Sequence, residues 1–165
     1  MGWFKRDKEG ITTSTKDKKE TPEGLWHKCP KCKVIVSVDD HARNLWVCAT
    51  CGHHDRINAV EYFSILFDEG KYTELNPKMS SGDPLKFEDT KKYTDRYSAS
   101  VKKTGLKDAV TTAYGTMNGI EVSMACMNFN FIGGSMGSVV GEKIARAIDY
   151  AIKNNTPFIM LSKSG

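Results

Sequence analysis

Four cysteines in two pairs constrain the fold of this chain more than any other feature. Cys29 and Cys32 form one Cys-x2-Cys pair, and Cys48 and Cys51 form a second pair after fifteen intervening residues. A two-residue gap lets a tight turn direct both thiolates at one ion, and two such turns complete a tetrahedral four-sulfur site. The spacing predicts a structural zinc site with these four ligands, and Gly52 stands where such a turn often needs a residue without a Cβ atom.

Other interpretations of the cysteines are a pair of disulfides or four ordinary buried thiols. Four thiolates would leave no open position for a catalytic ion. The histidines of the chain lie in the same region, and with four cysteines present none is needed as a ligand. We expect His53 and His54 to lie on the surface or beside the ligands. A segment this short buries little core, so the ion should supply most of its folding free energy. The apolar side chains expected to cover the site on a small sheet are Trp26, Val34, Val36, Leu45 and Trp46.

Composition excludes several classes of protein. The chain has 24 Lys and Arg against 20 Asp and Glu, and this net charge of +4 is too small by itself to indicate nucleic-acid binding. No apolar run approaches the roughly 18 residues of a membrane span, and the N-terminus has no apolar run of signal-peptide length. We therefore expect a cytoplasmic protein that does not contact membranes, in a compartment where thiols stay reduced.

The chain divides into three predicted parts. Residues 1–24 are polar and without periodicity, which favours a flexible tail. Residues 25–56 contain the cysteine pairs and form the predicted zinc ribbon. Residues 57–165 carry the periodic apolar patterns of an α/β domain.

The first part of this α/β segment has one clear helix. Apolar residues recur at helical spacing over 57–69, and Gly70 is a stop signal. Residues 71–107 are mostly polar, with a short helix predicted around 89–96. The lysines of this polar segment either face an anion or form a solvated helix face, and the second interpretation is favoured by charge alone. These lysines are Lys91, Lys92, Lys102, Lys103 and Lys107.

The clearest local signal is a β-hairpin. Two apolar-rich runs, Ala109–Met117 and Ile120–Phe131, flank the dipeptide Asn118-Gly119, which favours a turn in which both residues have positive φ. Cys126 lies inside the second run, and we expect it to be a small core residue rather than a nucleophile.

A glycine-rich turn, a helix and a strand follow the hairpin. Helical spacing is clear from Val139 to Ile152, and Pro157 precedes a predicted strand over 158–161. The turn before the helix could hold a phosphate, a carboxylate or an oxyanion on backbone N–H groups, or could serve close packing. Its residues are the candidate substrate-binding set Gly133, Gly134, Ser135, Met136 and Gly137.

Four segments together resemble the acetyl-CoA carboxylase carboxyltransferase β-subunit family of bacteria and plastids. They are the cysteine pairs with Gly-His-His, residues 85–96, the run Phe-Asn-Phe-Ile-Gly-Gly-Ser-Met-Gly-Ser-Val-Val-Gly-Glu-Lys, and the final Ser-Lys-Ser-Gly. The resemblance runs from about Trp3 to the last residue. It implies a zinc ribbon followed by a crotonase-like superhelix of strand-strand-helix units.

The same resemblance implies the reaction and the partners. In this family a carboxyl group moves from carboxybiotin, tethered to the biotin carboxyl carrier protein, to acetyl-CoA, and malonyl-CoA forms for fatty-acid biosynthesis. The implied assembly is α2β2 with the carboxyltransferase α subunit, and it works together with biotin carboxylase. Backbone N–H groups of glycine-rich turns stabilise the charge on the acyl-CoA oxygen.

The chain departs from the family pattern at its last residue. Gly165 would begin one of the oxyanion turns, but the expected Gly-Ala-Arg-Met continuation is absent. We therefore expect the N-terminal part of a longer subunit, with an incomplete crotonase-like domain and no activity alone, and the catalytic residues are not assigned.

A rival class is a nucleic-acid-binding zinc ribbon with an appended α/β domain. Five basic residues would then contact phosphates. They are Lys28, Lys31, Lys33, Arg43 and Arg56. A third interpretation is that the ribbon only stabilises the protein.

Overall fold

A computed structural model describes residues 24–163, and the chain splits into two compact units between Asp55 and Arg56. The predicted tail over 1–24 lies outside the described residues except for Gly24, and so does Gly165. None of the helices in the described part of the chain is long and apolar enough to cross a membrane.

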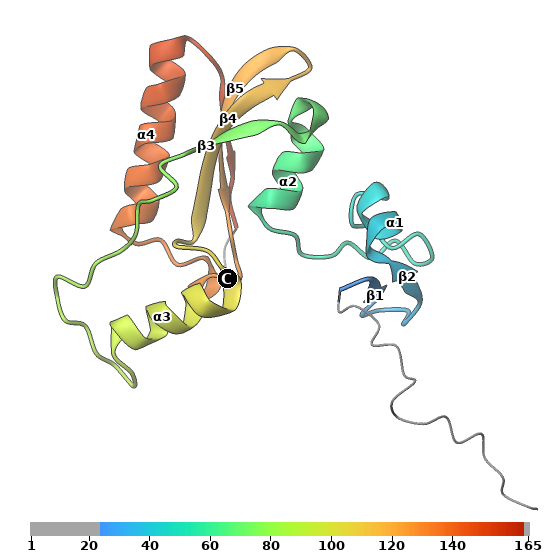
Figure 1. The fold of residues 1–165 in the computed structure, drawn as a ribbon, viewed down its shortest axis with the longest axis horizontal. Coiled ribbons are helices and arrows are strands. Elements are labelled where there is room, and N and C mark those ends of the chain that lie inside the picture. The colour runs from blue at the N-terminus through green and yellow to red at the C-terminus, as the bar shows by residue number, and fades with distance from the viewer. Residues whose placement is uncertain (1–23, 164–165) are drawn as a thin grey trace, which may run out of the picture. The chain divides into compact units, whose positions relative to one another are not determined.

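The first unit is built on a two-stranded antiparallel sheet. Strand β1 (Trp26–Lys28) pairs with β2 (Ile35–Ser37), and the short helix α1 (Val38–Arg43) follows directly (Figure 1). The helix begins where it does because the side chain of Ser37 accepts a hydrogen bond from the backbone N–H of Asp40 at 3.0 Å. This small sheet agrees with the prediction of a ribbon with little core.

The set of side chains predicted to cover the cysteines was partly wrong. Trp26 is 63% exposed and Leu45 is 59% exposed. Successive residues of a strand point to opposite faces, so Trp26 turns outward where His27 turns inward. His41 is buried in the interior of this unit instead and is only 3% exposed. The ring of Trp46 packs edge-on against the ring of His41.

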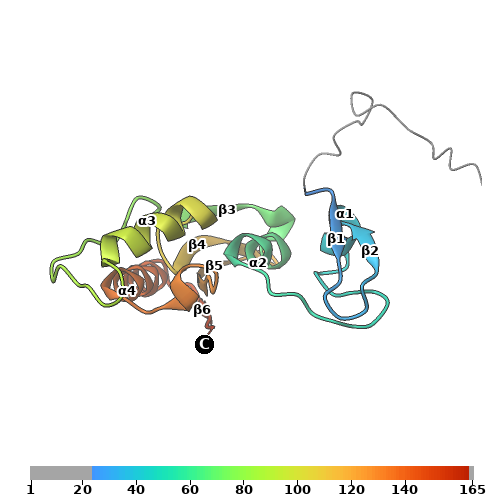
Figure 2. The ribbon, with the colours of Figure 1, turned by 90° about the horizontal axis from the view of Figure 1, so that it is seen from below.

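The second unit is a four-stranded sheet in the order β3-β4-β5-β6. Strands β3 (Tyr72–Leu75), β4 (Val110–Met117) and β5 (Ile120–Met127) are antiparallel, and β6 (Phe158–Leu161) runs parallel to β5. The connection from β5 to β6 passes through helix α4 (Ser138–Asn154), which lies along the sheet in Figures 1 and 2. From β4 to β6 the order is therefore strand-strand-helix-strand, as predicted.

Two helices precede β4 in the chain. Helix α2 (Ala59–Leu66) is followed by a 3-10 turn over Asp68–Gly70, and helix α3 (Tyr93–Thr104) ends at Gly105. The sequence predicts α2 well, whereas α3 is longer than the short helix expected around 89–96. Gly105 has a φ of 71°, a left-handed helix cap that glycine adopts without steric cost.

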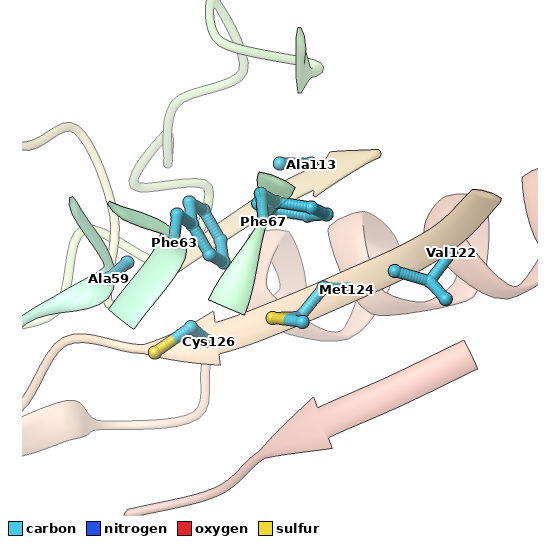
Figure 3. Close-up of a cluster of buried hydrophobic side chains, with 7 residues drawn as sticks. All are labelled: Ala59, Phe63, Phe67, Ala113, Val122, Met124 and Cys126. Carbon is cyan, nitrogen blue, oxygen red and sulfur yellow. The ribbon is translucent and has the colours of Figure 1, made fainter. Parts of the chain in front are cut away.

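Opposite faces of the sheet bury different helices. On one face, Phe63 and Phe67 pack against Met124 and Cys126 of β5 (Figure 3). On the other, Val140 of α4 joins a cluster with β4 and β5 residues, and α3 packs at its margin. Cys126 is fully buried, which confirms the prediction of a core residue.

The structure differs from the predicted apolar faces of the helices. Val60 of α2 is 56% exposed and Ile152 of α4 is 72% exposed, although both recur at helical spacing. Each helix buries fewer of its apolar residues than the sequence pattern predicts, because the sheet covers only one side of the helix.

The hairpin turn is confirmed and is held by a carboxylate from another segment. Asn118 has a φ of 51° and Gly119 a φ of 76°, as the Asn-Gly signal requires. Both carboxylate oxygens of Asp68 accept hydrogen bonds, from the N–H of Asn118 at 2.8 Å and of Gly119 at 2.9 Å. The Gly119 bond, followed by the Asn118 bond, lowers the pKa of Asp68.

Asp68→Asn should therefore lower thermal stability at neutral pH. The native pKa lies below the unfolded one, so the carboxylate stabilises the fold above the unfolded pKa of about 3.9. This contribution is lost as the pH falls through the native pKa. Thermal unfolding across the acidic range should show the two proteins converging at low pH. Asp149→Asn, on the exposed side of α4, is the control and should change little at any pH, whereas a pH-independent deficit in Asp68→Asn would contradict the assignment.

Candidate functional site

The thiols of the two cysteine pairs converge on one point. The sulfur atoms of Cys29, Cys32, Cys48 and Cys51 all lie within 4.8 Å of one another. Cross-pair distances are 3.7 Å from Cys29 to Cys51 and 3.6 Å from Cys32 to Cys48. Zinc–sulfur bonds of about 2.3 Å in a regular tetrahedron place the sulfurs about 3.8 Å apart. The cluster is therefore compatible with a zinc ion, and the cysteines are free thiols rather than disulfides.

Each cysteine pair forms a turn of the same backbone geometry. The N–H of Lys33 donates to the carbonyl of Cys29 at 3.0 Å, and the N–H of Gly52 donates to the carbonyl of Cys48 at 2.8 Å. These two donors follow their pairs at the same position and have φ values of 65° and 66°. The Gly52 prediction is thus confirmed, while Lys33 adopts the same left-handed conformation with a side chain.

Backbone hydrogen bonds prepare some of the thiols for ionisation. The N–H of Cys32 contributes most to lowering the pKa of Cys29 to about 6, and the N–H of Cys51 lowers the pKa of Cys48. At Cys32 the N–H of Val34 favours the thiolate, but desolvation and the neighbouring thiols raise its pKa to about 12. Crowded thiols cannot all ionise without a counter-charge, and a divalent cation supplies it while displacing the protons.

The glycine-rich turn lies between β5 and α4. Gly133 and Gly134, in a 3-10 turn over Ile132–Gly134, have φ values of 64° and 75°, which explains why glycine stands at both positions. The N–H of Gly134 donates to Phe131 and the N–H of Ser135 donates to Ile132, so these two donors serve the turn itself.

The five predicted turn residues do not share one cavity. Gly133 lines an open cavity of about 770 Å³, whereas Ser135 and Gly137 line a separate cavity of about 90 Å³. Met136 is 69% exposed and Gly134 is buried. Only the larger cavity falls within the 300–1,000 Å³ that small-molecule sites occupy.

Four segments of the second unit build this larger cavity. They are the start of α2, the end of α3, the residues that follow β5 and the glycine turn. Sequence reasoning missed most of them because they are distant in the chain. The lining residues are Asn58, Val60, Glu61, Lys103, Thr104, Leu106, Asn128, Phe129, Asn130 and Gly133.

A buried amide fixes the floor of the cavity. Asn128 is fully buried, its Oδ1 accepts the N–H of Ala59 at 2.9 Å, and its Nδ2 donates to Thr111 Oγ1 at 2.9 Å. These bonds join the start of α2 to the sheet, so the cavity wall is preorganised. At the cavity's edge, Lys103 supplies a positive charge on the exposed side of α3.

The start of α4 offers further hydrogen-bond donors. Gly137 is its N-cap residue, and no side chain caps the first turn. The first N–H groups of a helix have no intrahelical acceptor and carry the positive end of the helix dipole. This end of the helix faces the 90 Å³ cavity through Gly137 and Val139.

Solved structures give the class of fold. Two crystal structures of transcarboxylase 12S match, one with methylmalonyl-coenzyme A and methylmalonic acid bound and one with hydrolysed methylmalonyl-coenzyme A bound. The first has a TM-score of 0.53 at 24% identity and covers 67% of this chain and 19% of that chain. The second has a TM-score of 0.52 at 22% identity and covers 78% of this chain and 21% of that chain. The α/β unit therefore has the crotonase-like fold of carboxyltransferase domains.

Sequence comparison identifies the family of this chain more narrowly than the fold does. Residues 54–165 match the carboxyl transferase domain family, and the chain belongs to that family. Proteins from Pedobacter heparinus and Christiangramia forsetii, both named acetyl-coenzyme A carboxylase carboxyl transferase subunit beta, are each 58% identical over 165 residues. The match covers 100% of this chain but 59% and 58% of theirs, so the chain spans less than two thirds of these relatives.

Proposed function

We propose that the protein carrying this chain transfers a carboxyl group from carboxybiotin to acetyl-CoA, giving malonyl-CoA. The observation that carries the proposal is the open cavity beside Gly133, in a domain of the carboxyl transferase family. The names of the relatives that match the whole chain support acetyl-CoA as the acceptor.

The chemistry needs hydrogen-bond donors more than a metal. Carboxybiotin releases CO2 and leaves an anion that takes a proton from the acetyl methyl group, and the resulting enolate attacks CO2. Negative charge develops on the thioester oxygen, where fixed N–H donors stabilise it. The candidate groups are the turn over Gly133–Gly137, apart from the N–H groups of Gly134 and Ser135 that the turn itself uses, and the start of α4, which would bind and orient the thioester.

In this proposal Cys29, Cys32, Cys48 and Cys51 hold a zinc ion that stabilises the ribbon and takes no part in the reaction. The donor set of four sulfurs supports this role, because it fills a tetrahedral site. The partners would be the carboxyltransferase α subunit, the biotin carboxyl carrier protein and biotin carboxylase. Four reduced cysteines would suit the cytoplasm.

Charge reversal at the cavity tests the proposal. Lys103→Glu should raise the KM for acetyl-CoA about threefold to tenfold with little change in kcat, because coenzyme A is polyanionic. Lys102→Glu is the matched control, since the neighbouring lysine carries the same charge but does not line the cavity. The KM is measured from malonyl-CoA formation by the native protein and by each variant, in the presence of a carboxyltransferase α subunit. Equal KM changes in both variants would contradict the placement of the substrate.

Nucleic-acid binding by the ribbon is a second candidate. Trp26 is 63% exposed, and Lys28, on the same face of the small sheet, is also exposed. An exposed aromatic ring beside basic residues can stack on bases while lysines contact phosphates. A salt titration of single-stranded RNA binding tests it, because phosphate contacts make affinity fall steeply with salt. No binding at physiological salt would remove this candidate.

A further inference from the structure

An arginine packs over an aromatic ring at the rim of the larger cavity. The guanidinium carbon of Arg56 lies 5.0 Å from the centroid of the Phe129 ring, and Phe129 lines the cavity. A cation above an aromatic face is attracted by the electrons of the ring. Arg56 is the first residue of the second unit, so the arginine and the cavity belong to the same compact body.

The ring beneath the arginine is held in place by its neighbours. A Cβ atom placed on Gly134 would lie 3.7 Å from Cδ2 of Phe129, so the ring packs against the glycine turn. Asn128, directly before the ring, is fully buried. Asn130, directly after it, donates from Nδ2 to Asn58 Oδ1 at 3.2 Å. The ring therefore offers the guanidinium a fixed support, which lowers the ordering cost of binding a ligand there.

Arg56 differs from the other arginines in the described part of the chain. Arg43, Arg96 and Arg146 each lie within 3.2 Å of a carboxylate oxygen. Among residues 24–163, Arg56 has no such ion pair, and its side chain is exposed. Phe129 has no acceptor oxygen on its ring, so the planar N–H donors of the guanidinium are available to an anion.

The charges around the cavity also favour an anion. Lys103 is exposed and lines the cavity, which adds a second cation to that of Arg56. Glu61 supplies a carboxylate to the lining, but its Oε2 accepts the N–H of Asn58 at 2.8 Å and thereby caps α2. Two cations against one carboxylate leave a positive potential at the mouth of the cavity, which attracts anionic ligands.

We propose that Arg56, together with Lys103, binds phosphate groups in the nucleotide half of coenzyme A. The inference rests on the proposed function and makes Arg56 a specificity-determining residue of the same site. A guanidinium binds phosphate through two parallel N–H bonds, and the Phe129 ring orients it. A pantetheine thioester has the same reactive end but lacks these phosphates, so Arg56 makes the site prefer coenzyme A thioesters.

Binding of two thioesters tests the proposal. Isothermal titration calorimetry of the native protein with acetyl-CoA and with acetyl-pantetheine gives the two affinities. Arg56→Gln should weaken acetyl-CoA binding about tenfold, because hydrogen bonds to charged groups are lost, and should leave acetyl-pantetheine binding unchanged. Arg146→Gln is the matched control, since it removes an exposed arginine outside the cavity lining, and it should change neither affinity. Native acetyl-CoA affinity in Arg56→Gln, or equal weakening for both thioesters, would overturn the proposal.

A conservative variant separates phosphate recognition from a structural role. Arg56→Lys keeps the charge but loses the planar fork, so it should bind acetyl-CoA more tightly than Arg56→Gln and less tightly than the native protein. No recovery by lysine, at a thermal midpoint equal to the native one, would contradict a phosphate contact. Acetyl-3′-dephospho-CoA identifies the phosphate, because the effect of Arg56→Gln disappears with this ligand only if the 3′-phosphate is the one bound.

Turnover distinguishes failure of this inference from failure of the proposed function. With a carboxyltransferase α subunit, Arg56→Gln should raise the KM for acetyl-CoA and leave kcat within about twofold, since the contact lies away from the reacting atoms. If the native protein carboxylates acetyl-CoA and Arg56→Gln keeps the native KM, the inference fails and the proposed function stands. If the native protein neither binds nor carboxylates acetyl-CoA, both fail.

Discussion

Cys48→Ser should release the zinc ion and unfold the first unit. Cys48 is 4% exposed and its sulfur lies 3.6 Å from that of Cys32. Its substitution removes one of the four sulfur ligands of the tetrahedral site. Over residues 24–55 this unit has only two three-residue strands and one short helix, which cannot supply a core. Structural zinc contributes about 10–16 kcal/mol of apparent binding free energy, far more than such a module gains from packing.

Zinc content and resolved backbone amide NMR signals of residues 24–55 measure this effect. The signals of the second unit should remain, because residues 56–163 form a separate compact unit. Cys126→Ala is the matched control, since it removes a buried thiol outside the cluster and should leave zinc bound. A full equivalent of tightly bound zinc in Cys48→Ser would contradict the four-sulfur assignment.

Gly115→Val should destabilise the second unit by about 3 kcal/mol. A Cβ atom at this position would lie 2.8 Å from the backbone oxygen of Lys71 and 2.8 Å from Cδ1 of Phe67. Such contacts are shorter than Cβ atoms tolerate, and the Lys71 oxygen belongs to the backbone that leads into β3. Gly115 pairs with Tyr72 of β3, so relief of the clash would disturb the edge of the sheet.

Gly141→Ala provides a control with the opposite sign. A Cβ atom at Gly141 meets nothing within 4 Å, and the residue lies inside α4. Alanine is about 1 kcal/mol more favourable than glycine in a helix interior, so this variant should be slightly stabilised. Chemical denaturation of both variants measures the difference. Equal effects of the two substitutions would contradict the close approach at Gly115.

Local signals in the sequence predicted the elements that depend on neighbouring residues. Asn118-Gly119 fixed the hairpin, and the strand over 158–161 has the bounds that were expected. Strand β3 was missed, because Tyr72–Leu75 stands in a polar segment and becomes a strand only by pairing with β4. Its stability comes from a partner that is distant in the chain, which composition cannot reveal.

The candidate sites show the same difference between features set by neighbouring residues and features set by residues distant in the chain. The cysteine spacing is local and predicted the cluster of four sulfurs that the structure contains. The convergence of His27 and His41 on Asp55 was not predicted, because a strand, a helix and a loop that are separate in the chain bring these residues together. The glycine turn was identified, but the cavity beside Gly133 depends on α2 and α3, which only the folded chain brings together.

Transfer of labelled carboxyl groups tests the central claim most directly. The native protein, a carboxyltransferase α subunit and a carrier protein bearing ¹⁴C-carboxybiotin are mixed with acetyl-CoA, and labelled malonyl-CoA is measured. The account predicts label in malonyl-CoA only when both subunits are present. Label that stays on the carrier, or that leaves only as CO2 while acetyl-CoA remains unchanged, would contradict it.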